Sequence, residues 1–115
     1  MMDITVEQKS FQFAVRIVRL YKYLRSAKKE FVLAKQLLRS GTSIGANVAE
    51  AQQAQSRADF ISKMNIALKE TAETNYWLRL LHATEYLNDQ EFQSVFEDCN
   101  EVGKMLTAII KSTKN

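Results

Sequence analysis

Apolar side chains recur along the chain at the spacing of helices that bury one face. In the first such segment, Phe13, Ile17 and Leu20 are separated by four and three residues, which is the 3.6-residue period of an α-helix. Three further segments repeat this period. The four predicted helices run from about Thr5 to Ser26, from near Glu30 to about Gln53, from just after Ser56 and from about Asn88. Long helices joined by short turns predict an all-α fold, an antiparallel up-down-up-down four-helix bundle.

Polar pairs mark three of the predicted helix starts. In a capping box, two residues three positions apart satisfy each other's free backbone amides. The pairs are Thr5 with Gln8, Ser56 with Asp59, and Asn88 with Glu91. Their positions agree with the starts that the apolar period gives.

The second helix contains two glycines, each of which costs about 1 kcal/mol relative to alanine inside a helix. One interpretation is a break, with Gly41 ending one helix and Thr42 or Ser43 starting the next. The other is a continuous helix, because the apolar stripe keeps its phase across the region. Gly41, Gly45 and Ala49 would then form a line of small residues that lets a neighbouring helix approach closely, inside the bundle or across a subunit contact. We favour the continuous helix.

The composition fits one domain over residues 1–115. There is no proline, as expected for long uninterrupted helices, and 46% of the residues are hydrophobic. The single cysteine, Cys99, excludes an internal disulfide and a cysteine-based zinc cluster. We find no apolar run long enough to cross a bilayer and no secretory signal, and so expect a soluble cytoplasmic protein.

The charges are distributed unevenly, although 16 basic and 13 acidic residues leave a net charge of only +3. Cations recur every three residues on the first helix and continue into the second, whereas residues 89–101 are acidic. A phosphate-binding surface is one interpretation, and a solvated helix face without a ligand is the other. The candidate nucleic-acid-binding residues are Arg16, Arg19, Lys22, Arg25, Lys28, Lys29, Lys35 and Arg39.

Polar side chains share a face on each of the two central helices. The two sets are Ser43, Asn47 and Glu50 in the second helix, and Glu70, Glu73 and Trp77 in the third. If these faces meet, we expect a buried network with Asn47 as donor and a glutamate as acceptor. Such a network would fix the register of helices or subunits, or alternatively bind a ligand or partner. Together with Gly41 and Gly45, these residues are our structural and interface candidates.

Catalytic constellations are missing from the sequence. The only histidine, His82, follows Arg79 by three residues, whereas a di-iron bundle requires glutamate at that spacing. There is no glycine-rich phosphate loop. We therefore expect no enzyme, no cofactor and no metal, with His82 on a helix surface or interface and Cys99 in the core.

Two long segments resemble a known family. The first is residues 37–51, LLRSGTSIGANVAEA, and the second is residues 56–70, SRADFISKMNIALKE, followed by Glu73, Thr74 and the run Tyr76–Leu78. They resemble the four-helix-bundle proteins encoded in intervening sequences of bacterial 23S ribosomal RNA genes. The same family includes the accessory variability determinants of diversity-generating retroelements, which form five-fold rings with a basic surface that engages reverse transcriptase and nucleic acid. The resemblance implies a homo-oligomer, with a pentamer as the specific expectation.

Two functional hypotheses follow. The first is a non-catalytic accessory module that binds RNA or DNA, or a nucleic-acid enzyme such as a reverse transcriptase, by neutralising phosphates with little base readout. The alternative is an oligomeric scaffold that binds a protein partner without nucleic acid. Neither hypothesis involves a membrane.

Overall fold

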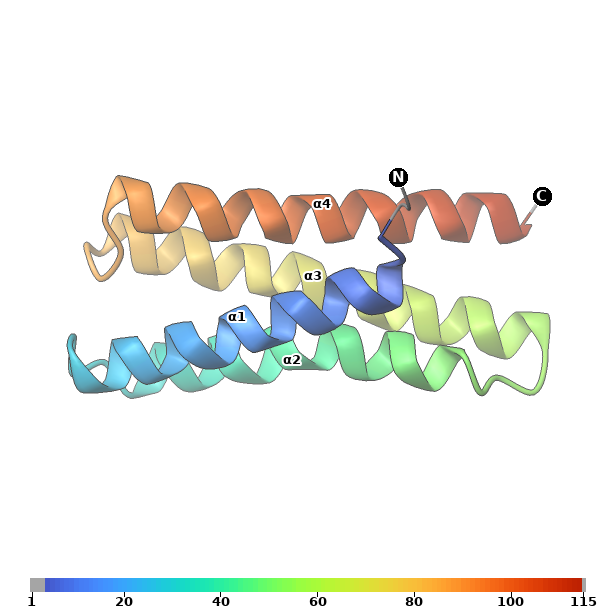
Figure 1. Ribbon diagram of the computed structural model, residues 1–115, viewed down its shortest axis with the longest axis horizontal. Coiled ribbons are helices and arrows are strands. Elements are labelled where there is room, and N and C mark those ends of the chain that lie inside the picture. The colour runs from blue at the N-terminus through green and yellow to red at the C-terminus, as the bar shows by residue number, and fades with distance from the viewer. Residues whose placement is uncertain (1–3, 115) are drawn as a thin grey trace.

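Four antiparallel helices make up the molecule, as the apolar period predicts (Figure 1). The computed structural model describes residues 4–114. The helices are α1 (Val6–Ser26), α2 (Val32–Ala51), α3 (Arg57–Ala83) and α4 (Asp89–Lys114). Successive helices run in opposite directions, so the fold is the predicted all-α up-down-up-down bundle. The bundle measures about 44 × 30 × 21 Å.

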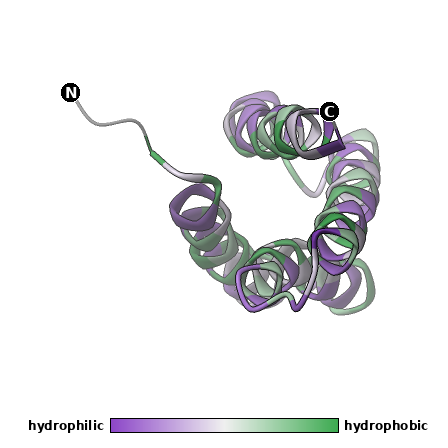
Figure 2. Ribbon diagram, turned by 90° about the vertical axis from the view of Figure 1, so that its right-hand side faces the viewer, coloured by the Kyte–Doolittle hydropathy of each residue, from purple (hydrophilic) through white to green (hydrophobic). Residues whose placement is uncertain are grey.

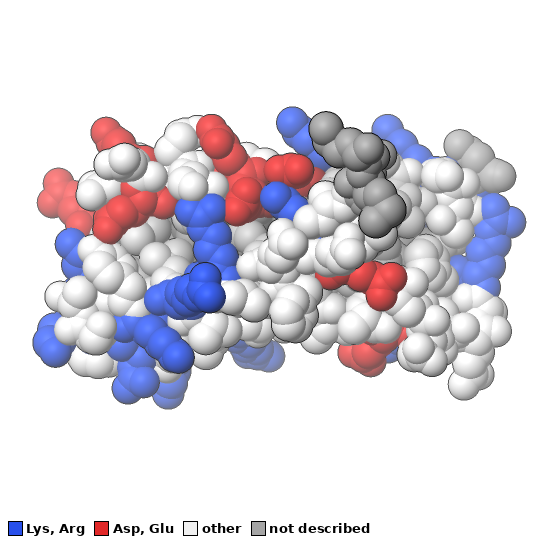
Figure 3. Space-filling view, in the orientation of Figure 1, with Lys and Arg blue, Asp and Glu red and all other residues white. Residues whose placement is uncertain are grey.

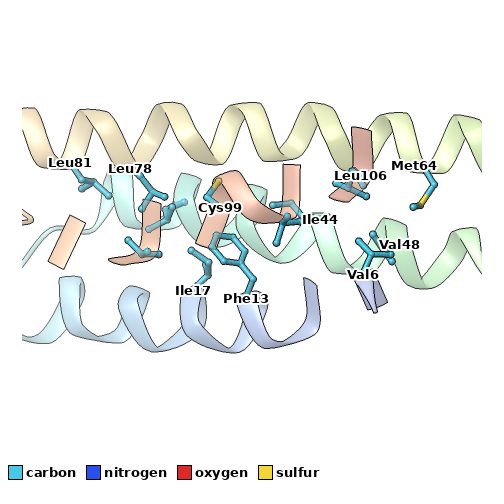
Figure 4. Close-up of a cluster of buried hydrophobic side chains, with 14 of the residues drawn as sticks. Val6, Phe13, Ile17, Ile44, Val48, Met64, Leu78, Leu81, Cys99 and Leu106 are labelled. Atoms are coloured by element: carbon cyan, nitrogen blue, oxygen red, sulfur yellow. The ribbon is translucent and has the colours of Figure 1, made fainter. Parts of the chain in front are cut away.

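The apolar core lies between the helices and takes one stripe from each of them (Figure 4). Phe13, Ile17, Ile44, Leu78 and Leu106 are all buried in it, and all lie on the predicted stripes. Full burial of one such side chain is worth about 1.5–3 kcal/mol. Isolated helices of this length are marginal in water, so this shared core holds the fold together.

Two of the predicted capping boxes are complete. The Gln8 N–H donates to Thr5 Oγ1 at 3.1 Å, and the Thr5 N–H donates to Gln8 Oε1 at 3.0 Å. The Glu91 N–H donates to Asn88 Oδ1 at 2.8 Å, and the Asn88 N–H donates to Glu91 Oε1 at 2.9 Å. These bonds satisfy amides that a helix start leaves free, and so place the starts of α1 and α4.

The predicted box at α3 is half formed. The Asp59 N–H donates to Ser56 Oγ at 3.0 Å, as predicted, but the Asp59 carboxylate accepts the Gln55 N–H at 3.2 Å instead of the Ser56 amide. The helix start is nevertheless where the pair places it, because the Ser56 hydroxyl alone caps the first turn.

Helix α2 begins two residues later than predicted because Glu30 acts as its cap. The Glu30 carboxylate is buried and accepts the backbone N–H groups of residues 32–34 at 2.9–3.0 Å. Its negative charge also lies beside the positive end of the helix dipole, which stabilises the helix. Glu30 therefore belongs to the turn between α1 and α2 and not to the helix.

The helix then continues without a break through both glycines, because α1 passes close beside them. A Cβ atom at Gly41 would lie 2.8 Å from two side-chain carbons of Ile17, and one at Gly45 would lie 3.2 Å from the Ser10 carbonyl oxygen. Only a residue without a side chain fits this approach. Gly41 and Gly45 thus serve a helix contact inside the bundle.

A buried polar pair between α2 and α3 escaped prediction. The hydroxyl oxygens of Ser40 and Thr74 lie 2.9 Å apart in a hydrogen bond, and both side chains are fully buried. An unpaired hydroxyl at this depth would be costly, so the pair favours one register of α2 against α3.

The four helices follow one another along an arc, with α1 and α4 at its two ends (Figure 2). The helices that are neighbours in sequence contact each other extensively, whereas α1 and α4 do so far less. Polar side chains bridge this last pair.

Candidate nucleic-acid interface

Cations gather at the end of the molecule that comprises the second half of α1, the α1–α2 turn and the first turn of α2. In Figure 3 they form a blue group over these elements, whereas red carboxylates lie over the first half of α4. This surface, called the basic end below, consists of Arg19, Lys22, Arg25, Lys28, Lys29 and Lys35. All of these side chains are exposed.

Within residues 4–114, no member of the basic end forms a salt bridge with a carboxylate. Glu30 lies between these cations in the sequence, but its carboxylate is buried and accepts backbone N–H groups. The charge of the basic end is therefore available to a ligand.

Arg16 does not belong to this surface, although its spacing on α1 suggested that it would. Its Nη1 lies 2.7 Å from Asp98 Oδ2, and its Nη2 donates to Ser94 Oγ at 2.6 Å. About two helical turns earlier, Lys9 lies 3.3 Å from Asp98 and 3.2 Å from Glu101. These cations join α1 to α4, so we leave Arg16 out of the proposed surface.

Arg39 also stands apart from the basic end. The pKa of Glu70 on α3 is raised by burial and by the neighbouring Glu73, and the charge of Arg39 opposes that rise. Arg39 therefore lies near carboxylates of α3, which reduces its value for binding phosphate.

Aromatic rings accompany the cations of the basic end. The Arg25 guanidinium carbon lies 5.5 Å from the ring centroid of Tyr21 and 5.7 Å from that of Phe31. A shallow hollow of about 390 Å³ is lined by these three residues together with Lys22 and Ser26. Sequence reasoning missed Phe31. The sequence pattern that could have identified it is an aromatic residue directly after a basic turn that lies on none of the apolar stripes.

The first half of α4 carries the opposite charge. Its Glu91 has a lowered pKa, first because the Asn88 backbone N–H donates to the carboxylate, and then because Tyr23 donates to it and Lys28 lies near. The same hydrogen bond raises the pKa of Tyr23. An anionic ligand on the basic end would thus be repelled by α4.

The predicted network around Asn47 is wrong in its partners. Asn47 Nδ2 donates to the Ser43 carbonyl oxygen of its own helix at 2.9 Å, and no glutamate accepts from it. Glu50 instead lies 3.7 Å from Lys63 of α3 in a largely exposed ion pair. On α3, the Trp77 indole donates to Glu73 at 3.1 Å, again within one helix. Asn47 and Trp77 thus bond along their own helices, and no hydrogen bond joins the two predicted sets within residues 4–114.

His82 and Cys99 occupy the places expected for them. His82 Nε2 lies 2.7 Å from Asp89 Oδ1 across the α3–α4 turn, and its ring stacks on Phe92 with centroids 4.2 Å apart. Cys99 is fully buried, and burial raises the pKa of its thiol to about 12. No group of three or more histidine, cysteine or acidic residues within 4–114 is arranged to hold a metal ion. The same stretch contains no helix with the length and apolar character to cross a membrane.

A second hollow lies on the outer side of α1 and α2, away from the basic end. It measures about 430 Å³ and is mostly apolar; its lining residues are Glu7, Phe11, Ala14, Thr42, Gly45, Ala46 and Ala49. Phe11 is 69% exposed at its rim. So large an exposed ring beside an apolar hollow is typical of a contact surface.

Comparisons with known proteins agree with the fold. Nothing among the curated proteins matches the chain. A solved structure from Bacteroides thetaiotaomicron, described as a protein of unknown function from the S23 ribosomal protein family, is 61% identical. The alignment covers 93% of this chain and 99% of that one, with a TM-score of 0.92. The sequence model of the 23S rRNA-intervening sequence protein matches residues 2–108. Because this match spans nearly the whole chain, the protein belongs to the 23S rRNA-intervening sequence protein family.

Proposed function

We propose that the protein is a non-catalytic, oligomeric accessory module that binds RNA or DNA through its basic end. The observation that carries this proposal is the separation of charge along α1 and α4. The exposed cations of the basic end form no salt bridge within residues 4–114, whereas those of the first half of α1 are bound to α4.

Phosphate neutralisation is the mechanism that this charge distribution supports. Each phosphate contact releases condensed counterions, which lowers the slope of log affinity against log salt by about 0.7 for single strands and about 0.9 for duplexes. Contacts to phosphates position a nucleic acid but carry no sequence information, so little sequence discrimination is expected. The carboxylates of α4 restrict the ligand to one side of the molecule.

The described residues support a role without catalysis. His82 is paired with Asp89 at the end of α3, with no nucleophilic side chain in that contact. The only thiol, that of Cys99, is buried, and its raised pKa keeps it protonated at neutral pH.

Homo-oligomerisation is part of the proposal, with a pentamer as the specific expectation. The apolar hollow beside Phe11 supports it, because a second copy that covered this ring would remove apolar surface from water. Several copies would present several basic ends to one nucleic acid, and such multivalency increases affinity without new contacts. A ribonucleoprotein enzyme such as a reverse transcriptase is the class of larger partner that this assembly suits.

Binding assays across a salt series test the proposal. We expect labelled RNA and DNA to bind at about 50 mM salt and to lose affinity steeply towards about 200 mM. A variant with Arg19, Lys22, Arg25 and Lys29 changed to Gln should bind at least tenfold more weakly while melting at an unchanged temperature. Absence of binding at low salt would contradict the proposal.

Light scattering tests the oligomer separately. We expect a mass near five times the 13.2 kDa of one chain. A variant with Phe11 changed to Ser should shift the mass downwards, whereas a mass of one chain for the unaltered protein would refute the assembly.

The second candidate function is an oligomeric scaffold that binds a protein partner and no nucleic acid. The apolar hollow at Phe11 favours it, since the same surface suits an apolar protein contact. The salt series distinguishes the two functions, because the scaffold should not bind nucleic acid at any salt concentration.

A further inference from the structure

We infer that the basic end selects single-stranded over double-stranded nucleic acid by stacking a base on Phe31. This inference rests on the proposed function and specifies the form of nucleic acid that the basic end takes.

Phe31 is exposed without a structural reason of its own. It lies in the last position before α2, and 49% of its surface is exposed. The ring takes no part in the apolar core. The buried apolar residues of α2 all lie in that core. A large exposed apolar ring in a polar, cationic turn is suited to contact with a flat apolar partner.

Cations hold the ring within reach of a nucleic-acid backbone. Arg25 lies beside both Phe31 and Tyr21, at 5.7 and 5.5 Å from the two ring centroids, which fixes its guanidinium at the edge of the hollow. Lys22 lines the same hollow, whose volume of about 390 Å³ lies within the range of small-ligand sites. One hollow therefore offers a stacking ring and phosphate-binding charges together.

The positive end of the α2 dipole plays no part in this site. Glu30 already occupies it, with its carboxylate buried against three backbone N–H groups. Phosphates must therefore be bound by the side chains of the basic end, of which Lys22 and Arg25 line the same hollow as Phe31.

Stacking is what distinguishes a single strand from a duplex. Every base presents a flat face that can stack on an aromatic ring, with a gain of roughly 5- to 150-fold in affinity per base. In a duplex, those faces are already covered by neighbouring base pairs. A cationic surface with an exposed ring beside its charges therefore favours single strands, while cations alone would bind a duplex equally well or better.

Two other exposed aromatic rings, Tyr23 and Tyr76, lie in less favourable surroundings. Tyr23 donates a hydrogen bond to Glu91 of the acidic helix. Tyr76 is 49% exposed, like Phe31, and Arg79 lies 5.9 Å from its ring, but the adjacent Trp77 is bonded to Glu73. Since a carboxylate beside the ring repels phosphate, Tyr76 provides a matched control.

The experiment measures affinity for single-stranded RNA, single-stranded DNA and the corresponding duplexes at one low salt concentration. We expect the unaltered protein to bind both single strands more tightly than the duplexes. In Phe31→Leu, single-strand affinity should fall about tenfold while duplex affinity stays the same, because leucine is apolar but has no π face. Tyr76→Leu should change neither, and Phe31→Tyr, which retains the ring, should keep single-strand affinity. The RNA and DNA arms show whether the 2′-hydroxyl adds to binding.

Three outcomes would overturn the inference: a preference for duplex, equal single-strand affinities for Phe31→Leu and the unaltered protein, or equal losses in Phe31→Leu and Tyr76→Leu. In each case the proposed function would still hold if the variant with Arg19, Lys22, Arg25 and Lys29 changed to Gln loses nucleic-acid binding. If the unaltered protein binds no nucleic acid at low salt, the proposed function fails as well.

Discussion

Helix α1 joins the bundle along two seams that are held by different chemistry. Towards α2 the seam depends on the absence of side chains, because a Cβ atom at Gly41 would press on the Ile17 side chain and one at Gly45 on the backbone of Ser10. Such a contact is steric and apolar, and neither salt nor pH alters it directly. Ile17, which lies against Gly41, is fully buried.

Towards α4 the seam depends on charge. Lys9 and Arg16 both bind Asp98, and Lys9 also binds Glu101. The side chains of Arg16 and Asp98 are 38% and 31% exposed, so water and salt reach this seam. Contacts of this kind weaken as ionic strength rises.

The comparison shows that the cations of one helix have two roles. In the first half of α1, a cation is a structural tie to α4. In the second half, the cations of α1 form no salt bridge with α4 within residues 4–114, and so remain available to a ligand. Position along the helix, and not charge alone, therefore decides which cations belong to the proposed interface.

The largest expected effect comes from filling the steric seam. Gly41→Ala should destabilise the fold by about 1–3 kcal/mol, because the new methyl would lie 2.8 Å from the branched side chain of Ile17. Each 1 kcal/mol corresponds to a fall of about 4 °C in melting temperature for a chain of 115 residues. Gly103→Ala is the control: its methyl meets only Thr71 at 3.3 Å, and the gain in helix propensity offsets that contact. Equal losses in the two variants would contradict the account.

A smaller effect is expected from breaking the ionic seam. Asp98→Ala removes the shared partner of Lys9 and Arg16 and should cost about 1 kcal/mol at low salt. The loss should shrink in about 1 M salt, where the Debye length is about 3 Å. Glu97→Ala, on the exposed side of the same turn, should have almost no effect. Urea unfolding at both salt concentrations measures the difference, and a loss that is independent of salt would show that the seam is not ionic.

The smallest expected effects concern pH. The folded state lowers the pKa of Glu91 below 4.5, so the stability that Glu91 contributes is present above pH 4.5 and lost as the pH falls through its folded pKa. Burial opposes the charge of Lys9, but Glu101 and Asp98 outweigh it and raise its pKa above 10.5. Its contribution is therefore present below pH 10.5 and lost at higher pH. Melting curves should show a flatter acid limb in Glu91→Gln and a flatter alkaline limb in Lys9→Met; unchanged limbs would contradict these assignments.

The fold was predictable because each helix carries its own signal. The stripe through Phe13 and Ile17 and the box of Thr5 with Gln8 are local patterns, and both are confirmed. The buried pair of Ser40 and Thr74 was missed because hydroxyl residues are usually exposed. The position of Ser40 in the helical period could have predicted its burial, because Ser40 lies three residues after Leu37, on the apolar stripe of α2.

The candidate site was less predictable because it depends on contacts between helices. Arg16 and Arg19 are equivalent in the sequence, and only the position of Asp98 on α4 separates them. Likewise, Asn47 had two classes of acceptor, a glutamate on another helix and a carbonyl on its own, and spacing does not choose between them. Side-chain pairs between helices can be predicted only if the rotation of each helix about its own axis is known. A single sequence gives that rotation only coarsely.

The most direct test compares two double variants of equal charge change on α1. Arg19 and Lys22 are changed to Gln in one, and Lys9 and Arg16 in the other, and nucleic-acid affinity is measured against salt together with the melting temperature. We expect the first variant to bind more weakly, with a salt slope shallower by about 1.4–1.8 and an unchanged melting temperature. The second should melt at a lower temperature with its salt slope unchanged. Equal losses of affinity in both variants would contradict the account, because net charge and not the basic end would then determine binding.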